Sequence, residues 1–96
     1  MKPEGNEPDE ILVERAKEAV VGDVRAFEAL MQRHQSRVLA NCHYLTGSAH
    51  DAQDLAQEVF VKAYFALGKF EGRSQFKTWI SSIKVNHCLN FLRKKK

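Results

Sequence analysis

Both prolines of this 96-residue chain, Pro3 and Pro8, lie within its first eight residues. Proline interrupts a helix more strongly than any other residue, because it lacks the backbone N–H donor and its ring clashes with the preceding turn. Every segment after Pro8 is therefore free to be helical. No segment alternates apolar and polar residues as a half-buried strand would. The sequence predicts an all-α fold, a compact bundle of about four helices.

Glycines and small polar residues divide the chain into these expected helices. A polar side chain that can accept a hydrogen bond from a backbone N–H of the first turn indicates the start of a helix, and glycine indicates its end. The first expected helix covers residues 9–20 and ends near Gly22, and the second is a long helix capped by Asp23 and ended by Thr46 and Gly47. The third is capped by Ser48 and ended by Gly68. The last is capped by Ser74 and runs to the terminal lysines.

Apolar residues recur at three- and four-residue steps, which predicts one buried face on each long helix. On the second helix this face includes His34 and Cys42, which we interpret as a packed histidine and a small buried hydrophobe. On the last helix the expected buried sector is Phe76, Ile80, Ile83 and His87.

The length fits one domain, expected over residues 9–93, after a flexible acidic segment 1–8 and before residues 94–96, the start of a linker to a missing second domain. Hydrophobic residues make up 44% of the chain, yet no apolar run approaches the roughly 20 residues of a membrane span. The acidic N-terminus does not resemble a secretory signal, and two cysteines make no disulfide framework. These features predict a cytoplasmic protein without membrane insertion.

The charge is divided unevenly along the chain. Residues 1–60 hold six Lys/Arg and eleven Asp/Glu, whereas residues 61–96 hold nine and one. A basic segment beside an acidic one indicates two partners of different kinds, and the basic half is a candidate binder of a polyanion. The alternative is a solvated, lysine-rich tail.

The third expected helix has acidic residues outside its apolar face. Asp51, Asp54 and Glu58 share one sector, and Val61 and Phe65 lie beside them. Exposed apolar residues next to ordered acids are typical of docking onto a basic protein. One alternative is a solvated face that favours the helix dipole. Another is a Mg²⁺ site of a nuclease, for which the three acids could supply ligands.

The last expected helix carries a large aromatic residue and amides on one flank. Trp79 is followed there by Ser82, Asn86, Asn90 and Arg93, a set that can stack on bases, bond base edges and hold phosphates. The loop before this helix contains Gly72 and could form a pocket for one flipped base. The alternative is that Trp79 belongs to the core and the Asn residues satisfy helix ends.

The histidines and cysteines form two adjacent pairs, Cys42-His43 and His87-Cys88. Neighbouring residues of a helix point about 100° apart, so each pair cannot easily converge on one zinc ion. No catalytic triad and no glycine-rich phosphate motif is present. We expect no cofactor and no metal.

Two stretches together resemble the second conserved region of bacterial sigma factors, in the extracytoplasmic-function (ECF) group. The first is the run D-x-x-D-x-x-Q-E-x-F from Asp51 to Phe60, and the second is F-x-x-W from Phe76 to Trp79, followed by Asn86. The resemblance covers about residues 10–95. It implies a non-enzymatic domain that binds core RNA polymerase, recognises and melts the promoter element near minus ten, and captures flipped bases of the non-template strand.

The resemblance also implies site residues. The positions that match the surface for a coiled coil of the largest polymerase subunit are Asp51, Asp54, Gln57 and Glu58, with Phe60, Val61 and Phe65 as apolar support. The positions assigned to promoter DNA are Phe70, Gly72, Arg73, Ser74, Gln75, Phe76, Lys77, Trp79, Lys84, Asn86, Asn90 and Arg93. The family further implies an anti-sigma protein that covers the same surfaces. A metal-dependent nuclease and a pure protein-interaction module are the alternative functions.

Overall fold

The computed structural model describes residues 7–19 and 22–95, and these form a helical domain without strands. Most of the expected flexible segment 1–8, together with Val20 and Lys96, lies outside the described residues. The expected first helix 9–20 is too long, because it ends at Glu18 and Ala19 already has an extended backbone (ψ 147°). The all-α class is confirmed. The elements are α2 (Asp9–Glu18), α3 (Arg25–Thr46), α4 (Ala49–Ala66), the short 3₁₀ helix η1 (Leu67–Lys69) and α5 (Phe76–Lys94).

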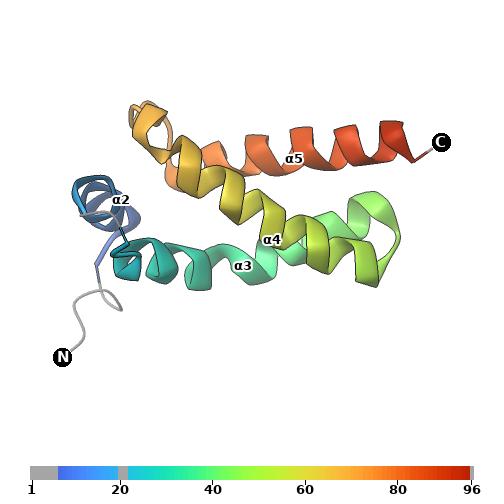
Figure 1. Cartoon of the computed structure of the whole chain (residues 1–96), viewed down its shortest axis with the longest axis horizontal. Coiled ribbons are helices and arrows are strands. Elements are labelled where there is room, and N and C mark those ends of the chain that lie inside the picture. The colour runs from blue at the N-terminus through green and yellow to red at the C-terminus, as the bar shows by residue number, and fades with distance from the viewer. Residues whose placement is uncertain (1–6, 20–21, 96) are drawn as a thin grey trace.

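The three long helices lie along an elongated body of 45 × 27 × 25 Å. α4 runs back along α3 in the opposite direction, and α5 then returns in the direction of α3 (Figure 1). α2 packs across the end of the bundle where α3 begins and η1 lies. In the described ranges, no helix has both the length and the apolar character needed to cross a lipid bilayer.

The turn between α3 and α4 is built as the sequence predicts. Gly47 adopts a left-handed backbone (φ 73°), and its N–H donates to the His43 carbonyl at 2.8 Å. Ser48 caps α4, because its Oγ accepts a bond from the Asp51 N–H at 3.1 Å. A side chain at position 47 would be strained in that conformation, so glycine specifies where α3 ends.

Two of the expected caps are wrong by one residue. Val24, not Asp23, precedes α3; Asp23 instead accepts bonds from the backbone and the guanidinium of Arg25, which lower the pKa of its carboxyl to about 2. Gln75, not Ser74, precedes α5, and the Ser74 hydroxyl donates to the Gln75 carbonyl at 3.3 Å. Asp23 thus accepts the first N–H of α3 from one residue further back than a cap, whereas the Ser74 hydroxyl donates to a carbonyl and accepts no N–H of α5.

The core draws on all five described elements, and on α5 it differs from the sequence expectation. Phe76 and Ile80 are buried as expected, but Lys84 and Cys88 complete the buried sector, while His87 is only half-buried. The reason is that α5 packs against α3 as well as α4, so its contact face turns toward α3. His34 and Cys42 of α3 are buried, which confirms their interpretation as packed residues.

Candidate functional site

A hollow of about 530 Å³ lies between α3 and α4. Val61 and Phe65 of α4 border it and are 56% and 78% exposed, so their predicted exposure is confirmed. Phe60 is buried at the base of the hollow. We call this the α3–α4 groove; its apolar lining is Val24, Phe27, Met31, Phe60, Val61, Tyr64 and Phe65. Phe27 and Met31 belong to the periodic apolar face expected on the second helix, but their place in the groove, like that of Tyr64, follows only from the pairing of α3 with α4.

The acidic residues of α4 have different partners. Glu58 Oε1 lies 2.6 Å from His87 Nε2 of α5, and Asp51 Oδ2 lies 3.2 Å from Lys95 Nζ. Asp54 is exposed, with His50 of its own helix 3.9 Å away. Gln57 is exposed beside the α3–α4 groove. The acidic sector therefore has two roles: its two ends attach α5 to α4, and its middle faces outward.

No three His, Cys, Asp or Glu side chains of the described segments are placed to hold one metal ion. Because Glu58 pairs with His87 of α5 and Asp51 pairs with Lys95 directly after α5, the acids of α4 are not arranged as a Mg²⁺ site. Cys42 and Cys88 meet in the core with their sulfurs 3.5 Å apart, whereas His43 is exposed. The two Cys-His pairs thus do not converge on one point.

The loop before α5 is anchored at both ends by buried aromatic rings. Phe70 and Phe76 are 6% and 3% exposed, with ring centroids 6.3 Å apart. The half-buried Trp79 packs on both, at 4.8 Å from Phe70 and 5.7 Å from Phe76. His34 packs on Phe76 at 5.4 Å between ring centroids and is bonded to Asp9 of α2 at 2.8 Å. Trp79 is thus partly core and partly surface, which combines the two alternatives left open by the sequence.

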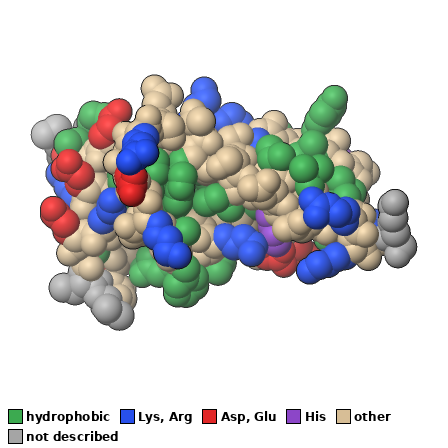
Figure 2. Space-filling view, turned by 90° about the horizontal axis from the view of Figure 1, so that it is seen from above, with side chains coloured by type: hydrophobic (Ala, Val, Ile, Leu, Met, Phe, Trp, Pro, Cys, Tyr) green, Lys and Arg blue, Asp and Glu red, His purple; other side chains and the backbone are tan. Residues whose placement is uncertain are grey.

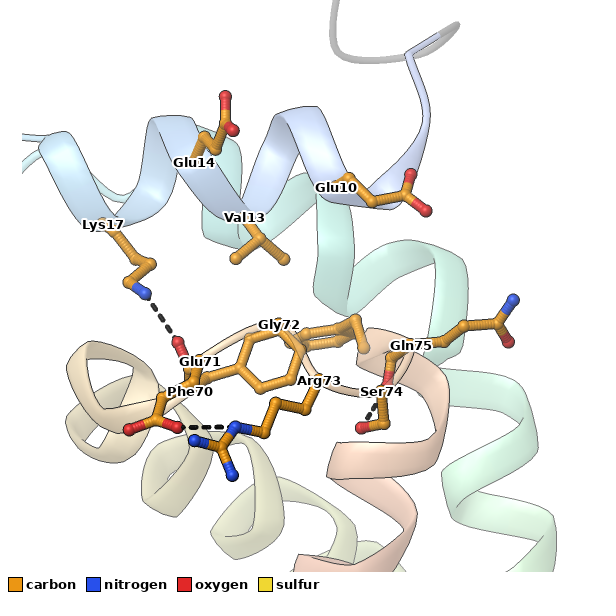
Figure 3. Close-up of a pocket in the computed structure, with 11 residues that line it drawn as sticks. Glu10, Val13, Glu14, Lys17, Phe70, Glu71, Gly72, Arg73, Ser74 and Gln75 are labelled. Atoms are coloured by element: carbon orange, nitrogen blue, oxygen red, sulfur yellow. Dashed lines mark hydrogen bonds and ion pairs between the residues drawn. The ribbon is translucent and has the colours of Figure 1, made fainter.

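A second hollow, of about 520 Å³, lies between this loop and α2; we call it the loop pocket. Val13 and Lys17 of α2 point toward the loop, and Lys17 Nζ donates to the Phe70 carbonyl at 2.6 Å (Figure 3). In the loop, Glu71 and Arg73 pair at 3.0 Å and Gly72 has a φ of 78°. The loop residues that line the pocket are Phe70, Glu71, Gly72, Arg73, Ser74, Gln75 and Phe76. Sequence reasoning identified this side of the pocket but missed α2.

The remaining candidate residues of α5 lie on two different sides of the helix. Asn86, Asn90 and Arg93 are exposed on the flank of Trp79. Lys77 is exposed and Lys84 is buried on the side that faces α3, where Lys84 Nζ donates to Asn41 Oδ1 at 2.6 Å. Viewed from above, Lys and Arg side chains are spread along the face that carries α5, while most acidic side chains gather at the end where α2 lies (Figure 2).

Comparisons with known proteins match this helical architecture. The family model "Sigma-70 region 2" matches residues 30–96. The chain belongs to the sigma-70 region 2 family. Over 86 residues, or 90% of the chain, it is 44% identical to the RNA polymerase sigma-H factor of Pseudomonas aeruginosa, and over 84 residues, or 88%, it is 42% identical to the ECF RNA polymerase sigma-E factor of Escherichia coli. The chain is thus a region 2 domain of the ECF type.

The chain spans less than half the length of these curated relatives, 43% of the sigma-H factor and 42% of the sigma-E factor. A solved structure matches it more completely. An engineered region 2 of sigmaE, determined by NMR in complex with GTAAAA, aligns with a TM-score of 0.80 and 38% identity, covering 91% of this chain and 87% of that chain. The sigma region 2 fold therefore extends over nearly the whole chain.

Proposed function

We propose that this domain binds core RNA polymerase and recognises and melts the promoter element near minus ten, capturing a flipped base of the non-template strand. The observation that carries the proposal is the loop pocket, which is bordered by buried rings at both ends of the loop. Its volume lies within the range of about 300–1,000 Å³ of pockets that hold small ligands. The domain supplies binding energy and positions the strand, whereas the polymerase performs the chemistry.

For the polymerase, we propose the outward part of α4 and the adjoining groove. Phe65 and Val61 expose apolar surface beside Asp54 and Gln57, so an apolar contact would be bordered by polar groups that fix its orientation. A basic coiled coil of the polymerase suits both properties. An anti-sigma protein that covers the same surface in the absence of polymerase is a further proposed partner.

Exchanging one exposed aromatic residue tests this polymerase surface. Phe65→Asp removes the apolar contact from a residue that is 78% exposed, so the fold is retained. We expect binding to core polymerase to weaken at least about tenfold, the effect of losing an aromatic anchor. Tyr44→Asp is the matched control, because Tyr44 is 87% exposed near the end of α3 and does not line the groove. Equal affinities of the two variants would reject the α3–α4 groove as the polymerase surface.

For DNA, we propose that the loop pocket takes one base while Asn86, Asn90 and Arg93 contact the neighbouring nucleotides. Stacking of a base on an aromatic side chain contributes about 1–3 kcal/mol, and Trp79 is partly accessible for it. Arg73, Ser74 and Gln75 are exposed on the loop and can bond the edge of an extruded base.

The only tryptophan of the chain, Trp79, reports binding along this flank of α5, next to the rings of Phe70 and Phe76 that line the loop pocket. We expect its fluorescence to be quenched by the hexanucleotide GTAAAA and by few of its single-base variants. Asn86→Ala, at an exposed position of α5, should weaken the binding. Gln53→Ala is the matched control, because it also removes an exposed amide but from α4. Quenching that is the same for every base variant would count against base recognition by this flank. Equal affinities of Asn86→Ala and Gln53→Ala for the hexanucleotide would also count against it.

A further inference from the structure

A third hollow, of about 210 Å³, lies between α3 and the first half of α5. We call it the α3–α5 cleft. Three cationic side chains line it, namely Arg37 from α3 and Lys77 and Lys84 from α5, together with the polar side chains of Asn41, Thr78 and Ser81. No Asp or Glu of the described residues lines it. The cleft and the loop pocket share no lining residue, so they are separate hollows.

Lys84 forms the base of this cleft without a counter-ion. It is 7% exposed, and its ammonium donates to two neutral atoms, Asn41 Oδ1 at 2.6 Å and Ser81 Oγ at 3.1 Å. An ammonium has three donors, so one remains after these bonds. Burial lowers the pKa of Lys84, and nearby Arg37 lowers it further.

The groups around Lys84 do not neutralise it. Cys42 and Cys88 act on it electrostatically, but burial raises the pKa of Cys42 to about 12, so this thiol is protonated at neutral pH. Arg37 Nη2 is bonded to His34 Nδ1, a nitrogen that accepts this bond when the ring is neutral. Lys77 makes no hydrogen bond or ion pair with any described residue. A buried cation without an opposite charge is costly, and a bound anion offsets that cost.

We propose that the α3–α5 cleft binds a phosphate group, held by Lys84 at its base and by Lys77 and Arg37 at its rim. A tetrahedral anion can accept the remaining ammonium donor, a guanidinium bond and the Thr78 or Ser81 hydroxyl at once. Two sources supply this chemistry, a backbone phosphate of a DNA strand and a free phosphate ion. For the DNA source the proposal deepens the proposed function and rests on it, because the family resemblance already assigns Lys77 and Lys84 to promoter DNA. It adds Arg37 of α3 and a defined phosphate site on the side of α5 away from Trp79.

Two titrations of the whole 96-residue chain test this site. In the first, backbone amide shifts are followed by NMR while inorganic phosphate is added at constant ionic strength, with sulfate and chloride for comparison. We expect saturable shifts at residues of the cleft, and a loss of these shifts in Lys84→Met. In the second, the affinity for the hexanucleotide GTAAAA is measured over a range of salt concentrations.

For single strands, log K falls with log[salt] with a slope of about −0.7 per phosphate neutralised. Removing one contact should therefore make the slope of Lys84→Met less steep by about 0.7 and weaken binding about three- to tenfold at low salt. Lys62→Met, at an exposed position of α4 outside the cleft lining, is the control and should keep the wild-type slope. Because Lys84→Met removes a buried charge, its thermal stability should not fall, which excludes unfolding as the cause.

The outcomes separate the two sources and the two proposals. Phosphate shifts in the cleft with an unchanged oligonucleotide slope would support the site with free phosphate as its ligand. A reduced slope with Trp79 quenching still dependent on base identity would support a backbone phosphate. Absence of cleft shifts together with equal slopes for Lys84→Met and Lys62→Met would overturn the site, while leaving base capture in the loop pocket intact. Trp79 quenching in the wild type that does not depend on base identity would count against base recognition by the flank of α5 but not against the cleft.

Discussion

His87 Nε2 of α5 lies 2.6 Å from Glu58 Oε1 of α4, and the two side chains are 19% and 57% exposed. This bond joins the helix proposed to hold the promoter strand to the helix proposed to bind polymerase. Lys95 makes a second connection of the same kind at 3.2 Å from Asp51. The acids of α4 thus contribute to the orientation of α5 as well as to an outward surface.

The His87–Glu58 contact should make a small but measurable contribution to stability. Because Glu58 is more than half exposed, solvent screens the pair, and we expect a coupling of about 0.5–1 kcal/mol. A double-mutant cycle of His87→Ala and Glu58→Gln, read from urea unfolding, measures it. Strictly additive effects of the two substitutions would show that the contact does not hold α5 to α4.

Two serines that look alike in the sequence should behave differently. Ser48 Oγ accepts the Asp51 N–H at the start of α4, so Ser48→Ala should destabilise the protein by about 1 kcal/mol. Ser74 makes no such bond to the N–H groups of α5, so Ser74→Ala should change stability by less than about 0.5 kcal/mol. Urea unfolding of both variants checks this, and equal losses would mean that Ser74 caps α5 in solution.

These serines also show what a sequence can reveal about this fold. The end of α3 at Gly47 and the cap at Ser48 follow from residues next to one another, so the pattern predicts them correctly. The buried face of α5 cannot be predicted from adjacent residues, because it depends on how α5 packs against two neighbouring helices. Helical periodicity placed His87 in the core because it follows Ile80 and Ile83 at the helical spacing, whereas contact with α3 brings in Lys84 and Cys88 instead.

The stability cost of Lys84 should depend on pH. Burial lowers its pKa in the folded state below the ordinary value of 10.5. Below the pKa that Lys84 has in the folded protein, the lysine is protonated in both the folded and the unfolded chain, and the full cost of burying its charge lowers the stability. As the pH rises toward 10.5, the folded chain loses this proton before the unfolded chain does. The wild type then gains stability relative to Lys84→Met. The difference between the two unfolding free energies should therefore narrow as the pH rises through the lowered pKa of Lys84 toward 10.5. A constant difference would show that Lys84 is not destabilised by its burial.

The core thiols should resist alkylation in the folded protein. Cys42 and Cys88 are both fully buried, and burial raises the pKa of Cys42 to about 12, so its reactive thiolate is scarce. We expect iodoacetamide at about pH 8 to modify the folded chain at least about 100-fold more slowly than the chain in urea. Mass spectrometry over time measures both rates. Comparable rates would mean that the contact between α3 and α5 at the two sulfurs opens readily.

The loop pocket illustrates the limit of sequence reasoning at the site. The aromatic and polar residues from Phe70 to Phe76 identify the loop because they are contiguous. The contribution of α2 cannot be inferred in this way, since Lys17 and Phe70 are 53 residues apart and meet only through tertiary packing. The same holds for Asn41 and Lys84, which are separated by 43 residues.

We propose that one base of a single strand enters the loop pocket. The most direct measurement is a search for intermolecular NOEs between the bases of the hexanucleotide and the pocket, because Val13 contributes methyl groups on the α2 side and Phe76 a ring on the loop side. We expect NOEs from the protons of a single base to both residues, with neighbouring nucleotides contacting the flank of Trp79. Contacts confined to the outer flank of α5, with no base proton near Val13 or Phe76, would contradict it.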